Sequence, residues 1–278
     1  MAGLTVTGMA TLPNPLPRLA TDPSGRSLGL RLPPGRLIDT TDDGPWHEPL
    51  LWHAEKPAAP GTWKALGAPA ARAGLLPVLV DTAVGLEDWA LLPGETSYPG
   101  DHDAEDVLAE YWEEETEDGG AAEEIEPFGD EWPGLAPAPA ALSVAPDTRA
   151  AQVADALCGD PESGIERAHL ALVPARRSAD IPAAIGWAGP VNYEPDVARV
   201  SAVLRSWEDR FGIRVVALGP DTLVLSVAAP PATQEDAEAV AAEHFAFCPD
   251  SILQGEEDTL RGYAKTLLGE DTWTFWWD

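Results

Sequence analysis

The sequence predicts an α+β protein with a mainly antiparallel sheet and packed helices in its C-terminal part, preceded by a small tryptophan-rich α+β lobe and an acidic linker. Three observations carry this prediction. After residue 167, strand and helix patterns follow the order β-α-β-β-α-α-β, tryptophans are frequent in a less regular N-terminal part, and carboxylates are concentrated between the two. The chain has 278 residues, of which 45% are hydrophobic, so a packed core is expected.

The expected domains are an N-terminal α+β lobe over residues 1–100, an acidic segment with a linker over 101–146, and a C-terminal α+β domain over 147–278. The linker prediction rests on composition, because residues 127–146 are rich in proline and alanine. The tryptophans of the first half are expected to supply core area where aliphatic residues are scarce, with an aromatic binding groove as the alternative.

The N-terminal lobe is expected to contain three strands and one helix. Residues 36–40 and 49–53 have the composition of short strands, and residues 63–73 predict a helix. Residues 75–81 predict a buried strand. Pro77 places this strand at a sheet edge, or lies at the strand's start, because proline has no N–H to donate to a ladder.

The C-terminal elements follow from hydrophobic periodicity. Residues 197–211 carry apolar side chains at steps of three and four and precede Gly212, as in an amphipathic helix with a left-handed cap. Thr233 is expected to cap another helix with two acidic residues in its first turn. The remaining elements are a strand at 168–173, a hairpin of 213–218 and 222–228, a helix at 260–268 and an aromatic strand at 272–277.

Charge is distributed unevenly along the chain. The formal net charge is −30, and residues 73–148 contain twenty acidic residues and no lysine or arginine. Fifteen of these carboxylates lie between Asp101 and Glu131, where they must be solvated or face something basic. Such a field repels phosphate, so binding to nucleic acid or to an anionic membrane surface is not expected.

The expected compartment is the cytoplasm. No stretch approaches the ~20 apolar residues of a membrane span, and the N-terminal residues lack the basic start of a secretory signal. The two cysteines, Cys158 and Cys248, are too few and too far apart for a disulfide framework.

Within the acidic stretch, residues 103–112 predict a short helix. Asp103 is the expected N-cap, and acidic residues in the first turn suit the helix dipole. The apolar residues of this helix recur at helical spacing and end with Tyr111 and Trp112, so they form one stripe.

The first functional hypothesis is a protein-binding module of the immunity-protein or antitoxin kind, whose acidic face binds a basic partner protein. Complementary charge accelerates the association of such pairs and makes it sensitive to salt. A solvated linker without a partner is the alternative for this segment. The candidate partner contacts are Trp112, Glu113, Glu114, Glu115 and Glu117.

A second group of candidate residues lies near the end of the helix that Thr233 begins. His244 falls on the apolar face of this helix, one turn before Cys248. Glu243 lies about 100° further round the helix, nearer the rim. Asp250 follows in the next loop, so a histidine, a thiol and two carboxylates occur within eight residues.

Three interpretations of this group are open. In the first, Cys248 is a small core residue and His244 a buried neutral imidazole. In the second, His244 deprotonates Cys248 in a hydrolase, and Asp250 or Glu243 orients the imidazole. In the third, His244, Cys248 and a carboxylate bind zinc with a distant ligand such as His169. No metal-binding spacing, nucleotide-binding motif or nucleophile elbow occurs, so no metal or other cofactor is expected.

Four C-terminal segments carry a family resemblance. They are Trp207–Gly212, Asp221–Leu223, the group from Glu243 to Asp250, and the closing Trp273–Asp278. Together they resemble a bacterial family of unknown function, the domain of unknown function 4253, over residues 167–278. The resemblance implies a domain assignment and implies no activity, ligand or catalytic residue.

Overall fold

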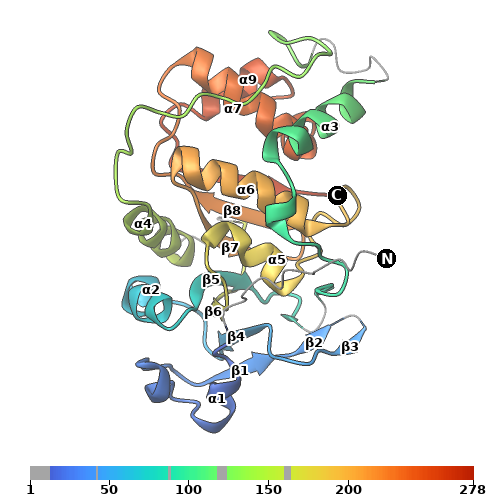
Figure 1. Cartoon of the computed structure of the whole chain (residues 1–278). Coiled ribbons are helices and arrows are strands. Elements are labelled where there is room, and N and C mark those ends of the chain that lie inside the picture. Colours follow the sequence, from blue (N-terminus) through green and yellow to red (C-terminus); the bar gives the residue numbers. More distant parts are fainter. Residues whose placement is uncertain (1–12, 42, 87–88, 118–123, 160–163) are drawn as a thin grey trace, which may run out of the picture.

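The computed structural model describes residues 13–41, 43–86, 89–117, 124–159 and 164–278. A seven-stranded sheet with the order β1-β4-β6-β5-β7-β8-β9 runs through the molecule (Figure 1). All neighbouring strands are antiparallel except β5 and β7, which are parallel, so the predicted α+β class with a mainly antiparallel sheet is confirmed. The strands are β1 (Gly35–Ile38), β4 (Leu51–Ala54), β5 (Leu76–Asp81), β6 (Ala168–Val173), β7 (Arg214–Leu218), β8 (Thr222–Ser226) and β9 (Thr272–Trp276).

Helices cover both faces of this sheet (Figure 1). One face is covered by α2 (Thr62–Arg72) and α4 (Pro146–Gly159). The other face is covered by α5 (Ile181–Ile185), α6 (Val197–Phe211) and α7 (Gln234–Phe247), and α3 (Ala104–Thr116) and α9 (Leu260–Thr266) pack outside these helices. The short elements are α1 (Pro17–Thr21), η1 (Arg26–Leu28), β2 (Thr40–Thr41), β3 (Gly44–Pro45), η3 (Pro99–Asp101), η4 (Ser178–Asp180) and α8 (Asp250–Leu253).

The residues of β5 explain why the sheet is buried on both faces. Successive side chains of a strand point to opposite faces. Val78 and Val80 accordingly join the core beneath α6 and α7, whereas Leu79 joins the smaller core beneath α2 and α4. A strand with apolar side chains on both faces therefore needs a helical layer on each side.

Local signals placed the helix ends correctly. The Asp103 side chain accepts hydrogen bonds from the backbone N–H groups of Glu105 (2.9 Å) and Asp106 (3.3 Å), so it is the N-cap of α3. Thr233 caps α7 in the same way. Gly212 ends α6 with a φ of 63°, the left-handed conformation that its sequence position predicted.

Of the two places predicted for Pro77, a sheet edge or a strand start, the structure shows the strand start. Pro77 is the second residue of β5, as expected for a strand start. However, β5 lies in the middle of the sheet, between β6 and β7. The sheet tolerates proline there because the ladder with β7 involves only Leu79 and Val80, further along the strand.

The sheet crosses the domain boundary that the sequence predicts. Strands β1, β4 and β5 come from residues 1–100 and the other four from residues 147–278, yet β5 lies between β6 and β7. The two regions therefore share one sheet in the structure. That the two regions are separate domains stays a prediction. Helix α4, which covers the sheet next to α2, was not predicted, because its alanine-rich sequence continues the composition of the preceding segment.

The proline- and alanine-rich segment expected to be a linker packs against the helices instead. Residues 124–145 contain no helix or strand, yet Ile125 is only 1% exposed and Ala136 only 2% exposed. The linker prediction is corrected here, and the reason is a long-range contact. The backbone of Ala136 hydrogen-bonds to Glu243 (2.6 Å) and Arg210 (2.9 Å), which no local pattern encodes.

Two further expectations concern the membrane and the cysteines. Among the described residues, no helix has the length and apolar character needed to cross a bilayer. Cys158 and Cys248 are both free thiols, which confirms that they form no disulfide.

Candidate functional site

Helix α7 carries two of the sequence-predicted site residues, Glu243 and His244. Both are 0% exposed. The expectation that Glu243 lies near the rim of the helix is therefore wrong. The reason is that α7 is covered on more than one side, by α6 and also by the segment 124–145 that contacts Glu243 directly.

The Glu243 carboxylate is held in a saturated hydrogen-bond network. Its Oε1 accepts from the backbone N–H of Ala136 (2.6 Å) and from Nη1 of Arg210 (2.7 Å). Its Oε2 accepts from Nη2 of Arg210 (2.6 Å) and from the indole N–H of Trp207 (2.7 Å). A buried carboxylate is stable only with such charged and hydrogen-bonded partners. Glu243 therefore ties α6, α7 and the segment 124–145 together and is not available to orient a catalytic imidazole.

His244 lies in an aromatic cluster. Its ring centroid is 4.5 Å from that of Trp273 and 4.8 Å from that of Phe275. Nδ1 is 3.0 Å from the Tyr263 hydroxyl, and Nε2 has no hydrogen-bond partner among the described residues. Burial, and secondly the positive charge of Arg210, lower the pKa of His244 to about 3. The imidazole is therefore neutral at neutral pH, as the core interpretation requires.

Cys248 is also a buried group with local partners. Its thiol donates to the carbonyl oxygen of Trp276 (3.0 Å) and lies 3.1 Å from the Ser251 hydroxyl. Burial raises the pKa of Cys248 to about 12, so the reactive thiolate is not present near pH 7. Because His244 bonds to Tyr263 instead, the structure does not form the imidazole–thiol pair of the hydrolase hypothesis.

The groups of the zinc hypothesis have separate partners as well. His169 lies on β6, where its Nδ1 donates to the carbonyl oxygen of Ala54 (2.8 Å). Asp250, the first residue of α8, accepts from the Gln254 side chain (2.8 Å) and from the backbone N–H of Asp278 (3.2 Å). In the part of the chain that the structure describes, no three His, Cys, Asp or Glu residues gather in a metal-binding arrangement.

Helix α3 presents its apolar side to the core. Trp112 is 0% exposed, its indole N–H donates to the carbonyl oxygen of Asp130 (3.1 Å), and its ring packs edge-on against Phe245 of α7 (5.5 Å between centroids). The expectation that Trp112 contacts a partner is therefore corrected. Its place in the apolar stripe, which helped to predict the helix, is also what buries it.

The opposite side of α3 is acidic and faces solvent. None of the four glutamates predicted to bind a partner forms an ion pair with a described Lys, Arg or His side chain. Three of them are exposed and one is half-buried. The exposed residues are Glu113, Glu114 and Glu117, and the half-buried one is Glu115.

Residues from the two predicted groups meet at the end of α3. Burial raises the pKa of Glu115, and the negative charges of Asp250 and then Glu114 raise it further. Asp250 belongs to α8, so carboxylates far apart in the sequence act on one another here. We call Glu114, Glu115 and Asp250 the acidic cluster. Here the charge of a member of one predicted group acts on a member of the other.

Two arginines of α6 were missed by the sequence reasoning. Arg210 holds Glu243, and both residues lie in segments that carry the family resemblance, so their shared membership was a usable signal. Arg199 pairs with Glu110 of α3 (2.8 Å) and with the buried Glu194 (2.8 Å). No sequence spacing indicates the contact with Glu110, because α3 and α6 come together only in the folded chain.

The fold and the buried network define an α+β domain with an aromatic core and a carboxylate held between two helices. Residues 169–278 match the model of a family described as domain of unknown function (DUF4253), which confirms the resemblance of the C-terminal part. The match begins in β6 and includes every strand and helix after it. Neither the curated proteins nor the solved structures contain a match to this chain.

Proposed function

We propose that the protein is a protein-binding module, of the kind represented by immunity proteins and antitoxins, whose acidic cluster receives a basic partner protein. The observation that supports this most is the position of Glu115. Its side chain is half-buried, burial and the negative charges of Asp250 and Glu114 raise its pKa, and it forms no ion pair with a described basic residue.

Like charges gathered at a partly buried position oppose each other, and solvent screens them incompletely. A cation placed against the cluster removes this repulsion and gains charge-assisted hydrogen bonds. In the unbound chain, the repulsion between these carboxylates lowers the stability of the folded state. Binding of a basic protein removes the repulsion, so the complex is favoured. We therefore infer that the cluster has a role in recognition.

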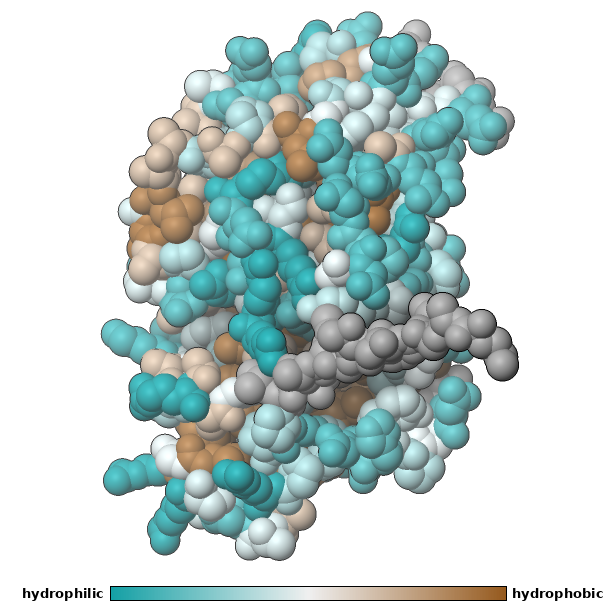
Figure 2. Space-filling view, viewed as in Figure 1, coloured by the Kyte–Doolittle hydropathy of each residue, from teal (hydrophilic) through white to brown (hydrophobic). Residues whose placement is uncertain are grey.

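The rest of the molecule supports this role through rigidity and long-range charge. The apolar stripe of α3 and the ion pair between Glu110 and Arg199 hold the acidic side of α3 in place before a partner arrives. Figure 2 shows hydrophilic residues over the part of the surface where α3 lies. A net charge of −30 attracts basic proteins over distances of about one Debye length, ~8 Å at physiological salt.

Affinity capture with matched charge variants tests the proposal. The full chain is immobilised and incubated with a lysate of the source cells, and basic proteins released by salt are identified and their affinity measured. In one variant the cluster is neutralised by Glu114→Gln, Glu115→Gln and Asp250→Asn. In the control, three exposed acids elsewhere are neutralised by Asp39→Asn, Glu48→Gln and Glu55→Gln.

Both variants change the net charge equally. We expect the cluster variant to bind the captured partner about tenfold more weakly and the control to bind it as the wild type does. If both variants bind the captured partner equally weakly, the interaction is non-specific charge attraction, and the proposal is contradicted. The absence of any salt-released basic protein also contradicts it.

A further inference from the structure

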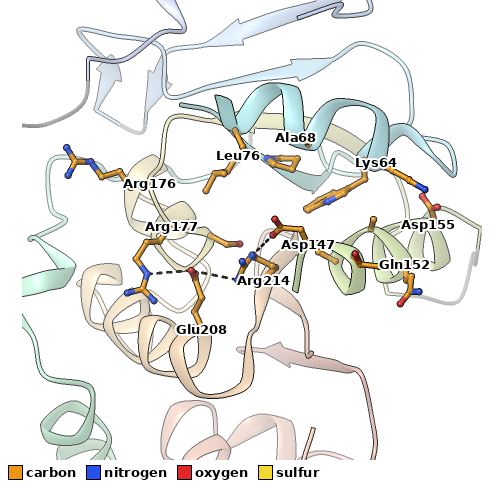
Figure 3. A pocket seen from close by; sticks show the side chains of 18 residues that line it. Lys64, Ala68, Leu76, Asp147, Gln152, Asp155, Arg176, Arg177, Glu208 and Arg214 are labelled. Atoms are coloured by element: carbon orange, nitrogen blue, oxygen red, sulfur yellow. Dashed lines mark hydrogen bonds and ion pairs between the residues drawn. The ribbon is translucent and has the colours of Figure 1, made fainter. Parts of the chain in front are cut away.

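A pocket lies on the other side of the sheet from the acidic cluster, between α2, α4 and the first residues of β5 and β7 (Figure 3). Its volume is about 530 Å³, within the ~300–1,000 Å³ of pockets that bind small molecules. One wall is apolar and includes the Trp63 ring, Leu76, Pro77 and Ala151. Such a wall suits the flat or aliphatic body of an organic molecule.

The pocket is lined by a larger share of basic residues than this strongly acidic chain has as a whole. Four basic side chains line it against three acidic ones, whereas the whole chain has 17 basic and 47 acidic residues. The basic residues are Lys64, Arg176, Arg177 and Arg214, and the acidic residues are Asp147, Asp155 and Glu208. Asp209 pairs with Arg177 (2.5 Å) and adds a fourth acidic side chain next to the pocket. The local charge is therefore close to balanced, and it opposes an anion less than the net charge of the chain does.

The acidic residues of the pocket are already used by the fold. Asp155 accepts a hydrogen bond from the backbone N–H of Gly61 (2.7 Å) before α2. Glu208 accepts from the backbone N–H of Ala179 (2.9 Å) and pairs with Arg177 (3.5 Å) and Arg214 (3.8 Å). These carboxylates therefore leave little negative charge to attract a cationic ligand.

Glu208 positions Arg214 and Arg177, and Arg177 is held more closely by Asp209 (2.5 Å). Arg214 also pairs with the exposed Asp147 (2.8 Å), and Figure 3 shows its guanidinium between Asp147 and Glu208. This arrangement fixes the direction of the arginine, as pre-organised anion sites require.

Lys64 differs from Arg177 and Arg214 because its ammonium group forms no ion pair with a described residue. It lies on the exposed side of α2 and lines the pocket. In Figure 3 it lies toward the end of the pocket opposite Arg177. Gln152 of α4 also lines the pocket, and its side chain forms no hydrogen bond with a described residue. One cation and one amide thus remain for a ligand.

We infer that this pocket binds a small organic anion, a carboxylate or phosphate with an apolar body. The body lies against the wall of Trp63, Leu76 and Pro77, and the anionic group is held by Lys64 and by the guanidinium of Arg214. This site is independent of the proposed partner surface, because α2 and α4 cover the opposite face of the sheet.

Fluorescence titration of the full chain with anilinonaphthalene sulfonate tests this inference. The probe is an aromatic anion, and N-phenylnaphthylamine is its neutral counterpart. Lys64→Glu reverses the unpaired charge, and Ala68→Trp fills the pocket from an exposed position on α2. The matched controls are Lys265→Glu on α9 and Ala138→Trp in the exposed segment. Circular dichroism verifies that each variant is folded.

We expect saturable binding of one probe per chain, weakened about tenfold by Lys64→Glu and by Ala68→Trp and changed less than about twofold by either control. Benzoate or phenyl phosphate should displace the probe, and the stronger competitor identifies the preferred anionic group. Equal affinity for the neutral counterpart, equal effects in the controls, or displacement by neither competitor overturns the inference.

Discussion

His244 and Cys248 lie one helical turn apart, and the sequence alone left three interpretations of the pair open. Helical periodicity placed both on the apolar side of α7, and the structure buries both completely. What periodicity could not provide is the identity of the groups packed against them. Tyr263 and Trp276 come from elements further along the chain, and they supply the hydrogen-bond partners that make the imidazole and the thiol part of the core.

The first prediction concerns the pH dependence that follows from burying His244. Its pKa is about 3 in the folded chain and ~6.5 when unfolded, so between these values the unfolded chain binds more protons. The stability from His244 is therefore complete above pH ~6.5 and is lost as pH falls, by about 1.4 kcal/mol per pH unit. In urea unfolding, the wild type should have a higher free energy of unfolding than His244→Gln at pH 7. This difference should become smaller as the pH is lowered to 4.

A non-titrating variant of the same aromatic cluster serves as the control. Trp273→Phe should lower the free energy of unfolding by a similar amount at every pH, because tryptophan does not titrate. A wild-type advantage over His244→Gln that stays constant from pH 7 to 4 contradicts the prediction.

The second prediction concerns thiol reactivity. Cys248 is 0% exposed and its pKa is about 12, whereas Cys158 is partly exposed. Native protein treated with iodoacetamide at neutral pH should therefore be labelled at Cys158 first, with Cys248 at least about tenfold slower until denaturant is added. Peptide mass spectrometry measures both sites in one sample. Rapid labelling of Cys248 in native protein would return the hydrolase hypothesis to consideration.

Helices and segments that are determined by nearby residues could be predicted from the sequence, whereas those determined by long-range contacts could not. The start and the buried side of α3 were predictable, because an N-cap and an apolar stripe are encoded within a few residues. The packing of residues 124–145 was not predictable, because Arg210 and Glu243, the partners of Ala136, lie 74 and 107 residues further along the chain. Composition correctly indicated irregular backbone there, but it could not indicate that the segment packs against two helices.

The third prediction tests this contact with two proline substitutions. Ala136→Pro removes the N–H that donates to the buried Glu243 carboxylate. A lost hydrogen bond to a buried charge costs about 1.5–3 kcal/mol, so chemical denaturation should show a loss of that order. Ala138→Pro alters an exposed alanine two residues away and should cost less than about 0.5 kcal/mol. Equal effects of the two substitutions would show that the contact contributes little.

In the molecule as a whole, sequence order and spatial order separate at β5. The predicted lobe and the predicted C-terminal domain each have their own strand and helix patterns, which is why composition divides the chain near residue 145. Pairing between distant strands is not encoded in such patterns. β5 forms six residue pairs with β6 and is the strand that joins β6 to β7, so the sheet is continuous only when the N-terminal region is present.

The fourth prediction follows from this position of β5. A fragment of residues 141–278 contains α4 and all of the family match, but it lacks the strand between β6 and β7. Without Val78 and Val80, the core beneath α6 is incomplete and β6 has no partner linking it to β7. We expect the fragment to show no cooperative thermal transition and weak near-ultraviolet circular dichroism, and we expect an added fragment of residues 1–140 to restore both signals. A cooperative transition of residues 141–278 alone would contradict this prediction. It would show that β7, β8 and β9 fold without β5 beside them, and that the predicted boundary is that of an independent domain.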